Sequence, residues 1–374
     1  TFATQDAESK LFSWGDNENG RLGLNGGTDR SSPTQIPGLT WSANSLNQDW
    51  DYSARMQAMI KTDGTLWTWG AGSDGGLGQG SNTDKSSPTQ IGTETTWSSA
   101  FCGEGGSAAA IKTDGTLWTW GNNNYGQLGL GDQNQYSSPK QVPGTTWATG
   151  DYKLSGGLRC IFAMKTDGSL WALGGEDDRG ELGQNSNSNY SSPRMIYGDA
   201  TTWSKTFAGH YSTFGVKTDG TLWSWGDNGY GQLGLNEGSP ARKSSPVQIP
   251  GTTWSHGSSG WGSVFGIKTD GTLWAWGENE IDCLGLNTGH DTNKSSPVQV
   301  PGTTWSKIAA ARDHTVAIKT DGTIWSWGEA TDGQLGQNNT TRRSSPTQIG
   351  SDTIWQAVMV STDRVFALIN DQTP

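Results

Sequence analysis

The sequence has little of what most enzymes and nucleic-acid-binding proteins use. Only 16% of its 374 residues are charged, it contains four histidines and three cysteines, and its formal net charge is −11. Cys102, Cys160 and Cys283 are an odd number without a C-x-x-C pair, so they predict neither a disulfide framework nor a zinc site. The negative charge argues against nucleic acid as a partner, because such binding is driven by Lys and Arg neutralising phosphates.

Long apolar segments and helical patterns are also absent from the sequence. No apolar run approaches the length that crosses a bilayer, and the charge disfavours an anionic membrane surface, so we expect no membrane insertion. Apolar residues do not recur at i, i+3, i+4 and i+7 over three turns. Instead, 55 glycines and many Asn, Ser, Thr and Asp separate short apolar segments, a composition typical of strands joined by turns.

One ten-residue string, KTDGTLWTWG, occurs twice unchanged, and near copies bring the number of related segments to seven. Two further markers, Ser-Ser-Pro and a lone Trp, also occur seven times in the same order. Three independent markers in a fixed order indicate seven copies of one unit. The last aromatic positions of the copies, 51 to 55 residues apart, are Trp14, Trp69, Trp120, Leu173, Trp225, Trp276 and Trp327.

Each unit is predicted to contain four short strands. An Asp-Gly turn at 114–115 predicts a two-residue hairpin that sets Ile111 opposite Trp118 and Ala109 opposite Trp120. The Ser-Ser-Pro and lone-Trp segments supply two more strands. Four strands repeated seven times predict an all-β, seven-bladed β-propeller, one domain over 1–374, with tryptophans filling the space between blades and the repeated lysines belonging to the framework.

The two ends of the chain complement each other. It opens with ESKLFSWG, the second half of a hairpin, and closes with RVFALINDQ, which aligns with the first half. We therefore expect the N- and C-terminal strands to share one blade, which closes the ring and removes open edges. A solenoid, the competing architecture, would need atypical capping repeats at its ends.

The segments WGNNNYGQLGLG (120–131) and WGDNGYGQLGLN (225–236) resemble the signature of the regulator of chromosome condensation repeat family. The resemblance covers essentially the whole chain and implies a seven-bladed propeller closed by both termini. Relatives include a guanine-nucleotide exchange factor, a plant ultraviolet photoreceptor and a secreted inhibitor of β-lactamases, so the fold does not fix the function. The photoreceptor carries G-W-R-H-T strings; the nearest string here, ARDHT, has Arg312 in place of the Trp.

No catalytic motif stands out, since the chain has neither G-x-S-x-G nor H-E-x-x-H. The acidic loops at 15–19, 131–135 and 175–181 lack the spacing of a calcium-binding loop and suit turns instead. We therefore expect a non-enzymatic protein with no catalytic residue, metal site or cofactor.

Binding is expected where the copies differ, in the segments between the lone Trp and the hairpin, which should meet on one face of the ring. Their Trp, Tyr and Arg residues are types enriched in binding hot spots. The loops before Ser-Ser-Pro are expected at the opposite face, as solvated tips. The candidate binding residues are Trp50, Tyr52, Arg55, Tyr152, Lys153, His210, Tyr211, Trp261, Arg312, His314 and Arg364.

These features favour a binding module that recognises a protein or glycan partner with one face and works outside a cell or on a virion. The alternatives are an exchange factor for a small GTPase and, less favoured, a tryptophan-based ultraviolet photoreceptor. Trp50 and Trp261 are the only tryptophans outside the repeat framework, so we expect both to lie off the blade interfaces.

Overall fold

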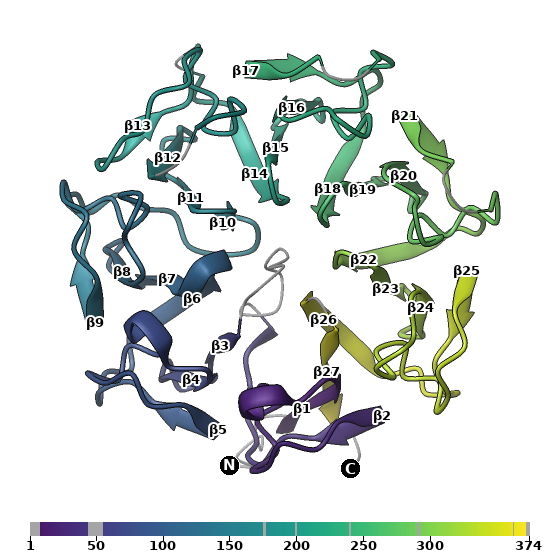
Figure 1. Cartoon of the computed structure of the whole chain (residues 1–374), viewed down its shortest axis with the longest axis horizontal. Helices are drawn as coiled ribbons and strands as arrows, with labels where there is room; N and C mark the ends of the chain where they lie inside the picture. Colours follow the sequence, from purple (N-terminus) through teal and green to yellow (C-terminus); the bar gives the residue numbers. More distant parts are fainter. Residues whose placement is uncertain are drawn as a thin grey trace, which may run out of the picture.

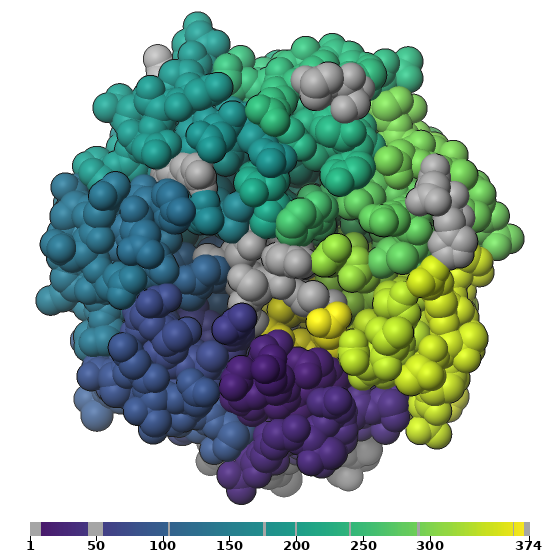
Figure 2. Space-filling view, viewed as in Figure 1, coloured from purple at the N-terminus to yellow at the C-terminus, as the bar shows by residue number. Residues whose placement is uncertain are grey.

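The computed structural model describes residues 8–43, 55–174, 177–198, 200–238, 241–289, 292–361 and 363–371. Its strands form seven antiparallel sheets arranged as the blades of a ring (Figure 1). The blades pack side by side around this ring (Figure 2). The prediction of an all-β, seven-bladed propeller is confirmed. No helix in these ranges is long and apolar enough to cross a membrane.

The fifth blade shows the common plan. Its strands pair in the order β14 (Trp203–Ala208), β15 (Ser212–Lys217), β16 (Leu222–Gly226) and β17 (Lys243–Gln248). The lone-Trp strand β14 lies nearest the axis, and the Ser-Ser-Pro strand β17 lies at the rim (Figure 1).

Five of the other six blades also have four strands in this order from axis to rim, whereas the described part of the second blade has three, and its lone Trp41 forms an isolated bridge to Lys61. The second blade contains β3 (Met56–Ile60), β4 (Leu66–Gly70) and β5 (Lys85–Gln90); the third contains β6 (Trp97–Cys102), β7 (Ser107–Lys112), β8 (Leu117–Gly121) and β9 (Tyr136–Gln141); and the fourth contains β10 (Leu154–Gly157), β11 (Cys160–Met164), β12 (Leu170–Gly174) and β13 (Arg194–Met195). The sixth blade contains β18 (Trp254–Ser259), β19 (Ser263–Lys268), β20 (Leu273–Gly277) and β21 (Lys294–Gln299), and the seventh contains β22 (Trp305–Ala310), β23 (His314–Lys319), β24 (Ile324–Gly328) and β25 (Arg343–Gln348). The closing blade contains β26 (Trp355–Ser361), β27 (Arg364–Asp371), β1 (Glu8–Gly15) and β2 (Arg30–Gln35).

The central hairpin of every blade except the closing one turns through three residues, where the sequence predicted two. In the third blade, the Gly115 N–H donates to the Lys112 carbonyl at 3.0 Å, and Gly115 has a φ of 77°. This is a type I turn followed by a left-handed residue. The Asp114 carboxylate stabilises it by accepting hydrogen bonds from the Thr116 N–H at 2.9 Å and the Thr116 hydroxyl at 2.7 Å.

The longer turn shifts the strand pairing by one residue. Ala110 pairs with Trp118 and Ala108 with Trp120, so the predicted partners of these tryptophans were wrong. Because side chains alternate along a strand, a one-residue shift moves the whole set to the other face. The tryptophans therefore share their face with two alanines, whose small side chains leave room for the rings.

The last Trp of each L-W-x-W-G segment links two blades. Trp120 is fully buried, and its Nε1 donates to the Gly76 carbonyl of the preceding blade at 2.8 Å. In the fourth blade the position holds Leu173, which has no such donor. Equivalent bonds of 2.8–2.9 Å run from Trp14 to Gln334, Trp69 to Arg21, Trp225 to Glu181, Trp276 to Gln232 and Trp327 to Cys283.

The hairpin lysine lies against the other two tryptophans of its blade. Lys112 Nζ is 4.1 Å from the centre of the Trp118 ring and 4.8 Å from that of Trp97. These are cation–π distances, and the stem of the lysine covers apolar surface. The prediction that the repeated lysines belong to the framework is confirmed, because the contact recurs at Lys61, Lys165, Lys217, Lys268 and Lys319.

The ring closes through strands from both ends of the chain. Strand β1 pairs with β27 in an unbroken antiparallel register that runs from Glu8 opposite Asp371 to Gly15 opposite Arg364. Strands β26 and β2 complete this blade on either side. The predicted closure is confirmed.

Deleting residues 364–374 removes β27 and leaves β1 and β26 without their shared partner. We expect the single cooperative melting transition to be lost, or the protein to aggregate through the exposed edges. Deleting 372–374 alone leaves β27 whole and serves as the control. Calorimetry in which the longer deletion melts like the full chain would contradict this account of closure.

Replacing Trp120 with Ala empties the space between the second and third blades and removes a buried hydrogen bond. We expect the free energy of unfolding to fall by roughly 3–5 kcal/mol. Trp120→Leu, which copies the natural Leu173, should lose less because the space stays partly filled. Urea denaturation of the three proteins measures this order, and equal stability of parent and Trp120→Ala would show that the ring does not hold the blades together.

Candidate functional site

Two kinds of loop meet on one face of the propeller, which we call the loop face. One kind joins the first and second strands of a blade, and the other precedes the Ser-Ser-Pro strand. The Asp227 N–H, in a loop of the second kind, donates to the Tyr211 carbonyl, in a loop of the first kind, at 2.8 Å. Antiparallel strands place alternate connections at the same end of a sheet. The prediction that the loops before Ser-Ser-Pro occupy the opposite face was therefore wrong.

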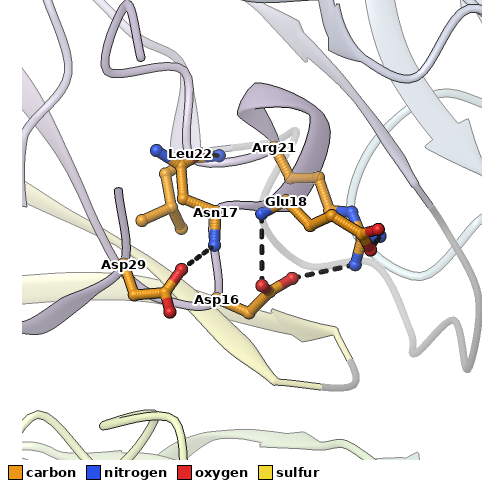
Figure 3. Close-up of polar contacts among 6 residues, drawn as sticks. All are labelled: Asp16, Asn17, Glu18, Arg21, Leu22 and Asp29. Atoms are coloured by element: carbon orange, nitrogen blue, oxygen red, sulfur yellow. Dashed lines mark hydrogen bonds and ion pairs between the residues drawn. The ribbon is translucent and has the colours of Figure 1, made fainter. Parts of the chain in front are cut away.

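The signature asparagine shapes the longer loops. In the closing blade, Asn17 Oδ1 accepts from the Leu22 N–H at 2.9 Å, and the Asn17 N–H donates to Asp29 Oδ1 at 2.9 Å (Figure 3). Asp16 Oδ2 in the same loop pairs with Arg21 Nη1 at 2.9 Å. The Asn is buried and bonded within its own loop, so it is structural. The same bond to a leucine N–H recurs at Asn123, Asp177, Asn228 and Asn279.

Four of the predicted binding residues come together on the loop face. The rings of His210 and Trp261 stack with centres 3.8 Å apart, and the Tyr211 ring meets His210 edge-on at 4.0 Å. The Arg312 guanidinium carbon lies 5.3 Å from the centre of the Trp261 ring. Arg179, from the fourth blade, lies 3.7 Å from the centre of the Tyr211 ring. We call these five residues the Arg-aromatic patch.

The patch arises from equivalent loop positions in neighbouring blades. Trp261 lies two residues before Ser263, which pairs with Gly277, and Arg312 lies two residues before the residue that pairs with Gly328. Divergence at one repeat position thus places different side chains side by side. Sequence analysis missed Arg179 because its loop was assigned to the other face. The available signal was a single Arg at a loop position that carries Tyr125 and Tyr230 in two other blades.

The imidazole of the patch is neutral. Burial, followed by the charges of Arg179, Arg159 and Arg312, lowers the pKa of His210 to about 3. The positive charge of the patch therefore comes from its arginines, and His210 acts as a flat, uncharged surface for the Trp261 ring.

Carboxylates surround the patch. Asp227 pairs with Arg179 at 3.4 Å and with Arg242 at 3.1 Å. Burial, followed by the charge of Glu280, raises the pKa of Glu278 to about 7, and burial raises the pKa of Asp313 to about 6. Arginines and carboxylates thus lie next to each other on the loop face, and burial disfavours the ionised form of Glu278 and Asp313.

The remaining candidates lie elsewhere. Trp50 and Tyr52 fall outside the described residues, and Arg55 is exposed on the loop face beside the second blade. His314 and Arg364 are only 0% and 1% exposed, because each begins a strand and packs beneath the loops. Neither side chain is accessible to a partner in this structure, so the expectation of surface binding residues at these two positions was wrong.

Two other expectations need correction. Tyr152 and Lys153 do not lie on the loop face: the Lys153 carbonyl accepts from the Met164 N–H, which places it at the hairpin end of β11. Trp261 does not lie clear of the blade interfaces, since its ring packs partly against the apolar cluster that includes Trp14 and Ala311. Trp261 therefore both packs between blades and remains partly exposed on the loop face.

The RCC1-like domain family model matches residues 10–369. The chain belongs to this family. The ultraviolet-B receptor UVR8 of Arabidopsis thaliana is 28% identical over 350 residues, covering 90% of this chain and 76% of the receptor. The ubiquitin ligase HERC2 of Homo sapiens is 26% identical over 350 residues, covering 90% of this chain but only 7% of the ligase.

Two solved structures share the fold. Human WBSCR16 superposes with a TM-score of 0.82 at 18% identity, covering 98% of this chain and 100% of that one. Prp20p of Saccharomyces cerevisiae, in a structure described with its binding to Gsp1p and histones, gives 0.80 at 17% identity, covering 99% and 93%. At these identities the likeness concerns the fold alone. Within the described ranges, no group of three or more His, Cys, Asp or Glu residues is placed to hold a metal ion.

Lowering the pH should stabilise this RCC1-like propeller through Glu278. Because burial raises the pKa of Glu278 from 4.5 to about 7, its contribution to stability is present below the lower value and is lost as pH rises through the higher one. Going from about pH 8 to about pH 6 should therefore raise the melting temperature of the parent more than that of Glu278→Gln. Identical pH dependence in the two proteins would exclude this contribution.

Proposed function

We propose that this RCC1-like propeller is a non-enzymatic protein-recognition module and that the Arg-aromatic patch is the centre of its binding surface. The observation that carries the proposal is the half-buried Trp261 ring, stacked on His210 and flanked by Arg312. Trp, Tyr and Arg are the residues that most often dominate binding energy at protein interfaces.

The patch is held in place before any partner arrives. His210 fixes the Trp261 ring by stacking, and Asp227 holds Arg179 over Tyr211. Side chains that are already ordered lose less conformational entropy on binding. Arg312 remains 43% exposed and pairs with Asp313 at 3.4 Å, so a partner carboxylate has access to its guanidinium. The chemistry suits a protein segment that carries an acidic side chain next to an apolar or aromatic one.

A related propeller supports a protein partner over a glycan. Yeast RCC1 (Prp20) is described bound to Kap60, and also with its binding to Gsp1p and histones. All three partners are proteins. Ubiquitin-ligase activity is not part of the proposal, because this chain spans only 7% of HERC2.

Capture of partners from the native source, quantified by mass spectrometry, tests the proposal. Arg312→Ala removes an exposed group with little effect on packing, and we expect it to weaken binding of the captured partner by about 2 kcal/mol, as hot-spot truncation does. Trp261→Ala should weaken binding at least as much, with some loss of stability because the ring also packs between blades.

Arg194→Ala is the matched control. Arg194 also stacks on a tyrosine, 3.9 Å from the centre of the Tyr190 ring, but it lies on the rim strand β13. The Arg194→Ala variant should capture the same proteins as the parent protein. If Arg312→Ala captures them equally well, or if Arg194→Ala loses them too, the patch is not the binding surface.

An exchange factor is the second candidate, because structures of yeast RCC1 share this fold. It would use a protein partner too, but it makes a separate prediction: release of bound nucleotide from a small GTPase. Fluorescent-nucleotide release with GTPases of the native source tests it, and release no faster than the spontaneous rate would exclude it for those GTPases. The ultraviolet-receptor alternative predicts that partner capture changes on irradiation, which the same capture assay measures.

A further inference from the structure

Basic side chains occupy one repeat position in adjacent blades, at the end of the inner strands far from the loop face. In the fifth and seventh blades, Lys205 pairs with Val216 and Lys307 with Ile318. Lys153 holds the same place in the fourth blade, opposite Met164. The sixth blade has His256 there, whereas the closing and third blades have Ala357 and Ser99.

The three lysines are linked through Tyr152 and residues next to it in the chain or the blade. Lys205 Nζ lies 5.4 Å from the centre of the Tyr152 ring, and that ring lies 5.2 Å from the ring of His256. Lys153 Nζ donates to the carbonyl of Ser204, the residue before Lys205. Tyr152, which is 5% exposed, thus contacts the fifth and sixth blades from the fourth and forms a floor. We call Lys153, Lys205 and Lys307 the lysine cluster.

The lysine cluster concentrates positive charge beside Tyr152. One nearby carboxylate, Asp151, lies 3.6 Å from Lys307 Nζ. Within the described part of the chain, Lys153 and Lys205 form no ion pair. Gathering three ammonium groups costs free energy, which a bound anion would offset.

The titration behaviour agrees with this geometry. Burial lowers the pKa of Lys153, and burial followed by the charge of Lys307 lowers the pKa of Lys205, with Asp151 opposing and Lys153 adding to the effect. His256 is neutral, because burial and then the charges of Lys205 and Lys307 lower its pKa to about 3. A bound anion would favour the charged lysines and relieve their mutual repulsion.

We propose that the lysine cluster is a binding site for a compact multivalent oxyanion of the phosphate class. All three lysine side chains are partly accessible, while Tyr152 and His256 are buried beneath them. Lysine ammonium groups bind phosphate as point charges with rotatable donors, and three of them match the several charges of a di- or triphosphate. This site lies at the other end of the inner strands from the Arg-aromatic patch and does not depend on the function proposed for it.

Calorimetric titration of the full chain with tripolyphosphate at low salt tests the site. Lys205→Met keeps the stem of the side chain but removes its charge, and we expect it to weaken tripolyphosphate binding by about tenfold or more. Because it removes one of three like charges, its melting temperature should not fall, which separates loss of binding from loss of folding. No binding by the parent protein would overturn the proposal.

Lys140→Met is the matched control, because Lys140 Nζ lies 5.5 Å from the centre of the Tyr136 ring on the rim strand β9. The tripolyphosphate affinity of Lys140→Met should equal that of the parent protein. An equal loss of affinity in Lys140→Met and Lys205→Met would show that the effect comes from overall charge, and it would overturn the proposed site. Citrate binding as tightly as tripolyphosphate would overturn the phosphate assignment. ATP separates the sources: comparable affinity shows that the phosphates of a nucleotide are accepted, and weaker affinity points to free polyphosphate.

Discussion

The contact between a tryptophan of one blade and the backbone of the preceding blade is the constraint on which the ring depends. Trp120 Nε1 reaches the Gly76 carbonyl, and its ring lies over Gly78, where an added Cβ would be 2.9 Å from that nitrogen. One interaction therefore requires both a tryptophan in the L-W-x-W-G segment of one blade and a glycine after the loop leucine of the preceding blade. This explains why two distant parts of the repeat vary so little within the chain.

Most of the architecture was predictable because six of the seven copies carry the tryptophan that makes this contact. Three markers, each present seven times, predicted the number of blades, and the split hairpin at the two ends predicted the closing blade. The hairpin register was not predictable from Asp-Gly alone, because that pair suits both two- and three-residue turns. The choice depends on Asp114 accepting two hydrogen bonds from Thr116, a side-chain contact that appears only once the turn has formed.

The candidate site was predictable only in part, for a different reason. Trp261 and Arg312 were found because they break the repeat, and equivalent positions in adjacent blades must lie close together. Divergence from the repeat did not predict whether a side chain is buried. Arg364 also diverges from the repeat, yet it begins a strand and packs under the loops. Arg179 escaped because the direction in which its loop leaves the sheet follows from strand order and not from composition.

The distribution of charge modifies what the net charge of −11 implies. Acidic residues concentrate among the arginines of the loop face, while lysines gather at the other end of the inner strands, in the fourth, fifth and seventh blades. The framework lysines do not contribute to this polarity, since each lies against tryptophan rings all around the propeller. A bulk acidic charge thus argues against an extended nucleic-acid surface, but it does not exclude a local anion site, because each blade sets its own inner-strand residue without disturbing the contacts that hold the ring.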